Sequence, residues 1–365
     1  MMCYCKKIKI DKKRTNMSKK TRIFKVVSVL VLVTLLLSLS SCGNRDKKVS
    51  KSGFYFDTII TITLYKTSDE KYIDECFDIA SDYEQKLSNT IDTSEISQIN
   101  KNAGKEYVKV SEETIELLKT GLSYCRQSDG VFDITIGKLS DLWNISNIAK
   151  ECQNDSNEVD ESNIPDSEQI DTLKAGIDYN KVLIDGDKVM LSNSDCKIDL
   201  GAVAKGFIAD KMKDYLNSKG VSSGIINLGG NILTIGTKTD GTNYHVGIQK
   251  PFADSGESFL SIEVSDKSVV TSGIYERYFE IDDKIYHHIL DINTGYPCEN
   301  DLYSVTIVSD KSVDGDALST ICFLKGVGDG MKYIEALEGI EAVFIKNDYS
   351  IVASSGIKDS IKIIE

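Results

Sequence analysis

The sequence contains little proline, histidine and tryptophan: its 365 residues include three prolines, three histidines and one tryptophan. Few prolines and scattered glycines exclude collagen-like and proline-rich classes. A surplus of positive charge is also missing, because the formal net charge is -13. The excess of acidic residues is larger in residues 42–365, which carry 33 basic and 55 acidic residues, a net charge of -22. A body this acidic argues against nucleic acid as a partner, since phosphate backbones bind basic faces.

No apolar segment is long enough to cross a membrane comfortably. Val26–Leu39 would span about 21 Å as a helix, against a hydrocarbon core of about 30 Å. Basic residues precede this segment and small residues follow it. This order is typical of a secretory signal peptide, which we predict over residues 1–41. A start at Met17 would give a more usual signal peptide, in which case residues 1–16 are an upstream mis-start.

The stretch Leu39-Ser40-Ser41-Cys42 matches a lipobox, in which the cysteine becomes the acylated first residue of the mature protein. We therefore predict a palmitate-bearing lipid anchor on Cys42, a polar tether over residues 42–53 and a folded domain over residues 54–365. The expected location is the extracytoplasmic face of the cell membrane. The alternative is an ordinary signal peptide with an incidental cysteine.

The cysteines after Cys42 lack the spacing of metal or redox motifs. No C-x-x-C pair occurs among them, and no Cys/His spacing of the usual kind favours zinc. An even number of cysteines in an exported protein leaves disulfides open. A domain this large does not need disulfide bonds to be stable, however, and several of these cysteines occupy apolar helical positions. We therefore expect buried free thiols. The residues concerned are Cys76, Cys125, Cys152, Cys196, Cys298 and Cys322.

Strand and helix patterns mix along the chain without regular βαβ alternation, which is typical of an α+β fold. Residues 54–65 alternate as a strand, and residues 70–87 have helical spacing. Ser111 is the expected N-cap of a second helix that ends at Gly130. Residues 147–171 are polar and acidic, and we expect a surface loop there. Further strands are expected at 181–191, 225–235, 244–249, 259–264, 269–271, 278–281, 285–290, 303–308 and 342–353, and helices at 202–219, 315–325 and 329–338.

One run of small residues, Asp199–Gly206 (DLGAVAKG), follows a strand and opens a helix. Small residues at a helix N-terminus let backbone N–H groups approach a phosphate, and Lys205 adds a point charge. The alternative for this run alone is a glycine-rich helix start.

A second cluster, Asp314–Thr320 (DGDALST), places Asp316 and Thr320 one helical turn apart on the same face. A carboxylate and a hydroxyl in this arrangement offer hard oxygen ligands for Mg²⁺. The alternative is a solvent-facing first turn, in which acids are favoured by the helix dipole.

Two of the three histidines, His287 and His288, precede an Asp291–Gly295 turn signal, so one of them is a candidate base or phosphate partner. The alternative is a strand followed by a simple turn. The stretch Gly130–Gly137 (GVFDITIG) is a candidate ligand-contact loop; its alternative is a simple helix exit.

Seven motifs in a fixed order resemble the ApbE family of FAD:protein FMN transferases, from about Phe56 to the C-terminus. No one of these motifs is specific by itself, but their shared order is. The motifs are SEISxIN at 94–100, GxFDxTxG at 130–137, DLGxxAKG at 199–206, NLGG at 227–230, SGxYER at 272–277, HIxDxxTG at 288–295 and DALxT at 316–320.

The resemblance implies a single T-fold-related domain of mixed, mainly antiparallel sheets with flanking helices, after a lipoprotein signal peptide. It also implies the reaction: Mg²⁺-dependent transfer of FMN from FAD to a threonine hydroxyl through a phosphoester bond, with release of AMP. The implied acceptors are flavoproteins such as Rnf/Nqr-type redox subunits or other exported flavoproteins.

By matching motifs, the resemblance assigns roles to individual side chains. The metal would be held by Asp316, Thr320 and the carbonyl of Ala202, with Asp316 also counted as catalytic. His288 would be the base that takes the threonine proton. FAD would be contacted by Phe56, Val131, Phe132, Asp133, Asp199, Lys205, His288 and Ile289.

The sequence departs from the family pattern at several positions. Ile292 replaces a proline, Asn231 replaces the aspartate of a GGD stretch, and Ile274 stands at an acidic position. The family's Met-Gly-Thr stretch is Phe56-Asp57-Thr58 here, so the flavin contact at Phe56 is the weakest of the assignments. The metal and phosphate residues are all present.

Two alternative functions stay open on the sequence alone. One is a lipoprotein that binds FAD without transferring it, although mere binding needs no base such as His288. The other is a Mg²⁺-dependent FAD pyrophosphatase that produces AMP and FMN from the same site. The outcome depends on whether water or threonine reaches the phosphorus.

We predict that Cys42→Ala abolishes lipidation, so that the protein is released from the membrane or stays unprocessed. Membrane fractionation together with the electrophoretic mobility of the precursor measures this. Unchanged processing and membrane retention would contradict the lipobox assignment.

Overall fold

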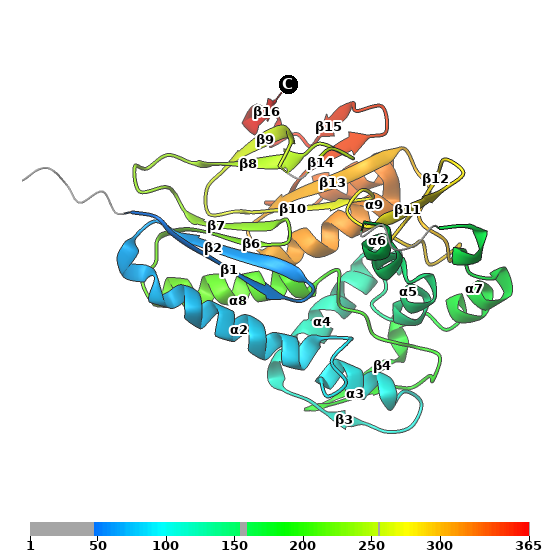
Figure 1. Cartoon of the computed structure of the whole chain (residues 1–365). Helices are drawn as coiled ribbons and strands as arrows, with labels where there is room; N and C mark the ends of the chain where they lie inside the picture. Colours follow the sequence, from blue (N-terminus) through cyan, green and yellow to red (C-terminus); the bar gives the residue numbers. More distant parts are fainter. Residues whose placement is uncertain (1–46, 154–158, 255, 365) are drawn as a thin grey trace, which may run out of the picture. The chain divides into compact units, whose positions relative to one another are not determined.

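An eight-stranded sheet, antiparallel throughout, forms the centre of the computed structural model, which describes residues 47–153, 159–254 and 256–364. Its strand order is β1-β2-β6-β7-β10-β13-β14-β15 (Figure 1). The predicted signal peptide and Cys42 lie outside the described residues. The strands of the eight-stranded sheet are β1 (Val49–Tyr55), β2 (Thr58–Leu64), β6 (Ser223–Leu228), β7 (Asn231–Gly236), β10 (Ser268–Gly273), β13 (Leu302–Ser309), β14 (Glu341–Lys346) and β15 (Ile351–Ala353).

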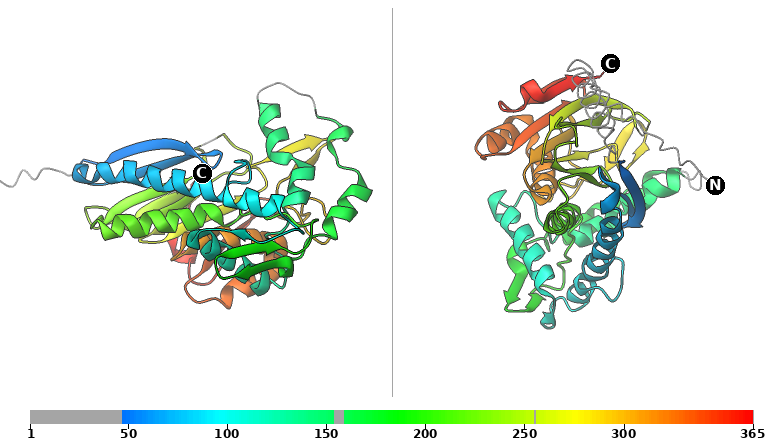
Figure 2. Two further views of the ribbon diagram at one scale, coloured as in Figure 1. Left: turned by 90° about the horizontal axis from the view of Figure 1, so that it is seen from below. Right: turned by 90° about the vertical axis from the view of Figure 1, so that its left-hand side faces the viewer.

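Three helices cover one face of this sheet. Strand β2 needs this cover because its side chains Ile60, Ile62 and Leu64 are apolar and fully buried. Burial of each of them stabilises the fold by about 1.5–3 kcal/mol. Helices α8 (Ala204–Ser218) and α9 (Ser312–Glu335) pack side by side against the sheet, and α2 (Lys71–Leu87) packs along α8 (Figures 1 and 2).

A small second sheet, in the order β16-β9-β8, covers the other face. Apolar side chains of both sheets form this layer, among them Tyr244, Leu260 and Val343. The three strands are β8 (Tyr244–Gln249), β9 (Ser258–Val264) and β16 (Ile361–Ile363).

A separate apolar cluster surrounds Trp143, which stacks on Tyr286 and donates its Nε1 hydrogen to the carbonyl of Gly295 at 2.8 Å. It joins α5 (Gly137–Trp143), α6 (Ile145–Gln153), α7 (Ser167–Lys174), β11 (Tyr278–Ile281) and β12 (Lys284–His287). The remaining elements are α3 (Glu95–Lys101), α4 (Glu112–Gln127), β3 (Val108–Lys109), β4 (Val182–Asp185), β5 (Lys188–Leu191), η1 (Thr67–Asp69), η2 (Glu161–Asn163), η3 (Tyr179–Lys181) and η4 (Lys358–Ser360).

Several local predictions agree with the structure. Ser111 caps α4 by accepting a hydrogen bond from Thr114 N, and α2 buries the apolar positions expected of it. Five of the six cysteines are buried and the sixth, Cys152, is half-buried; all six are free thiols. Among the described residues, none of the helices combines the length and apolarity needed to cross a membrane.

Other local predictions are wrong. The single strand predicted over 54–65 is a hairpin of β1 and β2, turned by Phe56 and Asp57 at positive φ angles of 51° and 56°. Strand β1 begins at Val49, inside the segment predicted as a tether. The loop predicted over 147–171 contains much of α6 and all of η2, and α7 begins at Ser167. By contrast, the two helices predicted at 315–325 and 329–338 are confirmed as the two parts of α9, which a kink at Gly326 separates (φ 70°, ψ 177°), although the first part begins earlier, at Ser312.

Candidate active site

Two adjoining cavities, of about 180 and 310 Å³, form one continuous cleft, because they share eight lining residues. The smaller cavity is lined by Val131, Phe132, Asp133, Asp199, Ala202, Lys205, His288, Ile289, Asp316 and Thr320. Phe56 lines the larger cavity. The structure therefore brings all eleven predicted FAD and metal residues to one cleft, although they come from distant segments of the chain.

Asp316 lines this cleft and is 4% exposed. Its Oδ2 accepts a hydrogen bond from Gly206 N at 2.6 Å, and its Oδ1 accepts one from Asn231 Nδ2 at 3.1 Å. Lys205 Nζ lies 3.5 Å from the same Oδ1. These contacts hold the carboxylate in one orientation while one side of it faces the cleft.

A close approach of two helices creates this arrangement. A Cβ atom at Gly206 would lie 2.3 Å from the carbonyl oxygen of Ser312, so only glycine lets the first turn of α8 meet the first turn of α9. The same contact brings Gly206 N within reach of Asp316. The glycine of the DLGAVAKG run is therefore needed for helix packing.

Asp210, one turn further along α8, caps α9. Its Oδ1 accepts a hydrogen bond from Ser312 N at 2.7 Å and its Oδ2 accepts one from Val313 N at 3.0 Å. Lys311, the N-cap residue of α9, provides no side-chain cap. Burial, aided by Asp314, raises the pKa of Asp210 to about 6 against these two hydrogen bonds. The first turn of α9 thus depends on a carboxylate from another helix.

The donor set fits a hard divalent cation. Ala202, Asp316 and Thr320 line the same cavity and offer carbonyl, carboxylate and hydroxyl oxygens, which Mg²⁺ prefers. Thr320 Oγ1 lies 3.4 Å from Ser272 Oγ and 3.5 Å from the carbonyl of Asp316. No cluster of three or more His, Cys, Asp or Glu residues that could hold a metal occurs in the described part of the chain. A metal held here would therefore need further ligands from a substrate phosphate or water.

The loop from 130 to 137 is held from within. Asp133 Oδ1 accepts hydrogen bonds from Thr135 N at 2.8 Å and Thr135 Oγ1 at 2.7 Å, and its Oδ2 accepts one from Tyr179 N at 2.8 Å. Burial raises the pKa of Asp133, while these hydrogen bonds act in the opposite direction. Asp133 thus shapes the loop that presents Val131 and Phe132 to the cleft.

The two neighbouring histidines differ in their contacts. His288 lies in the cleft, with its Nδ1 3.2 Å from the carbonyl of Arg277; a carbonyl only accepts, so Nδ1 carries the hydrogen and Nε2 keeps a lone pair. His287 is buried, donates its Nε2 hydrogen to the carbonyl of Cys298 and accepts from Ile289 N. Burial lowers the pKa of His288 to about 3, with Arg277 contributing, and burial lowers that of His287 to about 4. Both pKa values lie well below the unperturbed histidine pKa of about 6.5 that the sequence alone suggests. Both rings are therefore neutral at physiological pH.

Phe56 lies at the rim of the larger cavity, in the turn between β1 and β2. Its backbone N–H donates to Glu84 Oε1 at 2.5 Å, which fixes the turn on α2. Lys150 of α6, which lines the same cavity, lies 3.9 Å from Asp57.

Sequence reasoning gave no role to three residues that surround the cleft. Asn231, noted only as a departure from the family pattern, holds both Asp316 and Ser312. Glu276 and Arg277 belong to the SGxYER motif and line the cleft beside His288. Desolvation in the cleft raises the pKa of Glu276 to about 7, although Lys205 and Arg277 oppose the shift.

An α+β domain in which one cleft presents oxygen ligands, an ammonium group and a neutral imidazole has the groups of an enzyme that acts on phosphorylated substrates. The family model described as the ApbE family matches residues 56–344. An FAD:protein FMN transferase of Klebsiella pneumoniae (strain 342) is 36% identical over 313 residues, 85% of this chain and 93% of the relative. Another, of Treponema pallidum (strain Nichols), is 31% identical over 356 residues, 92% of this chain and 95% of the relative.

A solved structure gives the same result. The crystal structure of the ApbE protein of Thermotoga maritima MSB8 matches with a TM-score of 0.74 at 29% identity, over 84% of this chain and 97% of that one. The chain belongs to the ApbE family, and it is an enzyme of this family of transferases. The predicted fold class, an α+β ApbE domain with mainly antiparallel sheets, is confirmed.

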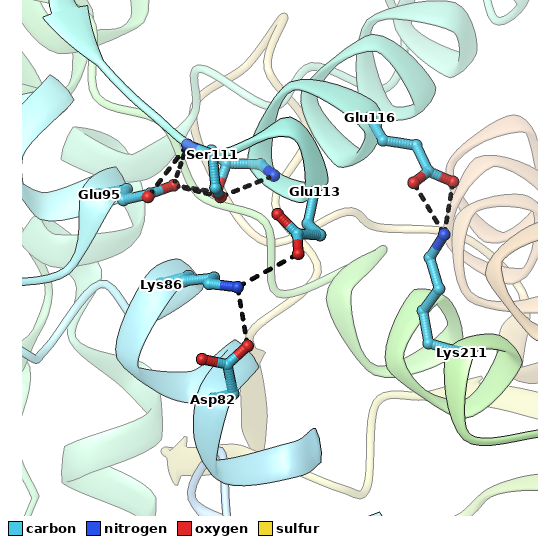
Figure 3. A network of polar contacts seen from close by, with 8 residues as sticks. Asp82, Lys86, Glu95, Ser111, Glu113, Glu116 and Lys211 are labelled. Carbon is cyan, nitrogen blue, oxygen red and sulfur yellow. Dashed lines mark hydrogen bonds and ion pairs between the residues drawn. The ribbon is translucent and has the colours of Figure 1, made fainter. Parts of the chain in front are cut away.

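Asp210 and Glu95 provide a matched pair of substitutions. Glu95 holds the first turn of α4 as Asp210 holds that of α9: it accepts hydrogen bonds from Ser111 N and Ser111 Oγ (Figure 3) and from Thr114 Oγ1. We expect Asp210→Ala and Glu95→Ala each to lower the free energy of unfolding by about 1–2 kcal/mol. The first removes the cap of α9 and the second removes the hydrogen bonds that hold Ser111, the cap of α4.

Only Asp210→Ala should weaken metal binding, by roughly tenfold or more, because only α9 carries Asp316 and Thr320. Urea unfolding and Mn²⁺ binding by electron paramagnetic resonance in the presence of FAD measure the two effects. Equal Mn²⁺ affinity in the two variants would show that the cap does not position the ligands.

Proposed function

We propose that the enzyme transfers FMN from FAD to a threonine hydroxyl of a target flavoprotein, with Mg²⁺ as cofactor, and releases AMP. The observation that carries this proposal is that Asp316, Lys205 and His288 line one cleft. A phosphoryl-type transfer needs a site for charge neutralisation next to a group that removes a proton from the nucleophile. The names of the transferase relatives support the same reaction.

Two cationic side chains, Lys205 and Arg277, line both cavities and can contact a pyrophosphate. Carboxyl groups outnumber them in the smaller cavity, which Asp133, Asp199, Glu276 and Asp316 also line, so most of the charge neutralisation would have to come from a divalent cation. A divalent cation held by Asp316, Thr320 and the carbonyl of Ala202 would neutralise phosphate charge that develops as the pyrophosphate bond breaks. Backbone N–H groups at the start of α8 add positive potential on the side of Gly201.

His288 has the tautomer required of a base. Its Nε2 lone pair is free while Nδ1–H is held by the Arg277 carbonyl. In the proposed step the threonine oxygen forms a bond to the FMN phosphorus, the phosphorus–oxygen bond to AMP breaks, and the threonine proton passes to Nε2. Burial is the main cause of the low pKa of His288, and the positive charges of Arg277 and Lys205 add to it. The phosphates of bound FAD would offset the contribution of these two charges.

We also propose that the enzyme acts on the extracytoplasmic face of the membrane, anchored by lipid at Cys42. The lipobox sequence supports this location. Its acceptors would then be exported flavoproteins or the exposed domains of Rnf/Nqr-type redox subunits.

The test combines the full chain in detergent with FAD, Mg²⁺ and an Rnf/Nqr-type subunit domain produced without flavin. The expected result is covalent flavin on an acceptor threonine, detected by mass spectrometry, with one AMP released per flavin. Release of AMP and free FMN, with no labelled acceptor, would show a pyrophosphatase instead. FAD binding without AMP release would show a binding protein.

Asp316→Ala should lose transfer almost completely while the protein still unfolds cooperatively, because this carboxylate faces a ligand. Circular dichroism and transfer at several Mg²⁺ concentrations separate the two effects. Parent-like transfer with unaltered Mg²⁺ dependence would remove Asp316 from the metal site.

His288→Ala should lower the single-turnover transfer rate by about 10²–10⁴-fold, the usual contribution of a positioned general base. FAD affinity should change much less. His287→Ala is the control: it should cost stability, because buried partners lose their hydrogen bonds, while transfer by the folded protein stays near the parent rate. If His288→Ala fails only because FAD no longer binds, His288 is a binding residue.

A further inference from the structure

The outward face of the β1–β2 hairpin changes character along its length. Toward the base, Ser50 pairs with Thr63 and Ser52 pairs with Thr61, with hydroxyl oxygens 2.9 and 2.8 Å apart. The hydroxyl groups of each pair form a hydrogen bond with one another, and their exposure to water costs little free energy. At the tip the next pair on the same face is Phe54 and Ile59.

Phe54 and Ile59, here called the hairpin-tip pair, are 67% and 61% exposed. They are the most exposed large apolar side chains of the described residues. Directly paired residues of antiparallel strands have Cβ atoms about 5 Å apart, so the two side chains form one apolar patch. An exposed apolar patch of this kind marks a binding surface more often than scattered single residues do.

The hairpin that carries the pair is held firmly from behind. Tyr55 stacks on Phe77 of α2 with ring centroids 5.9 Å apart, and Phe56 N donates to Glu84 of the same helix. The pair is therefore presented on a fixed scaffold, which lowers the entropic cost of binding a partner.

The hairpin-tip pair adjoins the opening of the cleft. Phe54 precedes Phe56 by two residues and Ile59 follows Asp57 by two, which is about 7 Å of extended chain in each case. Phe56 and Asp57 line the same cavity as His288. A polypeptide that brings a hydroxyl to His288 through this opening would cross the hairpin tip.

We propose that the hairpin-tip pair is the docking surface for the acceptor polypeptide, which carries an apolar side chain within a few residues of its threonine. This inference rests on the proposed function. Among the described residues, β1 is an edge of the eight-stranded sheet, so its outer backbone groups give an extended acceptor segment a place to pair.

The charges around the hairpin favour a polypeptide over lipid. Surface binding to anionic lipid requires unpaired basic residues beside the apolar ones. Lys51, on the same strand, is instead paired with Asp74 at 2.8 Å and with Glu70 at 3.5 Å. Lys150, the basic residue next to the turn, likewise has an acidic neighbour, Asp57, at 3.9 Å.

The test is the double substitution Phe54→Thr with Ile59→Thr, which continues the hydroxyl pairs of the same face and keeps strand-forming residues. The full chain in detergent is assayed for FMN transfer to the flavin-free Rnf/Nqr-type subunit domain, and for FAD binding. The matched control is Ile363→Thr, which removes an apolar side chain that is 58% exposed on β16.

We expect the double variant to raise the KM for the acceptor by about tenfold or more, because two side chains buried in the interface are lost. FAD affinity and the single-turnover rate constant at saturating acceptor should stay near the parent values. Ile363→Thr should leave the KM unchanged. An unchanged KM in the double variant would overturn the proposal, as would a loss of vesicle binding or of self-association without a change in KM. If the parent chain itself labels no acceptor, the proposed function fails first and this inference fails with it.

Discussion

The contact between the first turns of α8 and α9 is the interaction on which the cleft depends. At Gly206 the two backbones lie so close that no side chain fits between them. This closeness lets one helix donate a backbone hydrogen bond to Asp316 while Asp210 caps the other helix. Lys205, adjacent to Gly206, is placed beside Asp316 by the same contact. The helix start proposed to bind phosphate and the helix start proposed to hold the metal therefore share one packing constraint.

The helices and strands that the sequence predicts well are those with a local cause. Helix α4 has a capping serine and a clear apolar stripe, and the buried positions of α2 follow helical spacing. The β1–β2 turn was missed because apolar residues alternate straight through it and its positive-φ positions are Phe56 and Asp57, where glycine or asparagine would be the usual signal. Helix α6 carries Ile145, Ile148, Ala149 and Cys152 at helical spacing, but it was missed because its second half was grouped with the polar, acidic residues that follow it.

The sequence predicts which residues line the cleft but not the contacts among them. The ordered motifs contain these residues, and recognising the motifs does not require knowledge of the fold. Neither the Asp210 cap nor the double role of Asn231 follows from any motif, because each joins segments about 80 or more residues apart. The shifted pKa of His288 likewise depends on burial and on Arg277, which spacing in a sequence does not reveal.

The single tryptophan of the chain has a consequence for spectroscopy. Trp143 is 1% exposed, stacks within its own aromatic cluster and contributes to the wall of the larger cavity. All indole fluorescence of the protein therefore originates at one wall of the cleft. Since flavins absorb light in the range where a buried indole emits, occupancy of the cleft by a flavin would quench this emission by energy transfer. The protein thus contains its own optical reporter of ligand binding, free of background from any second tryptophan.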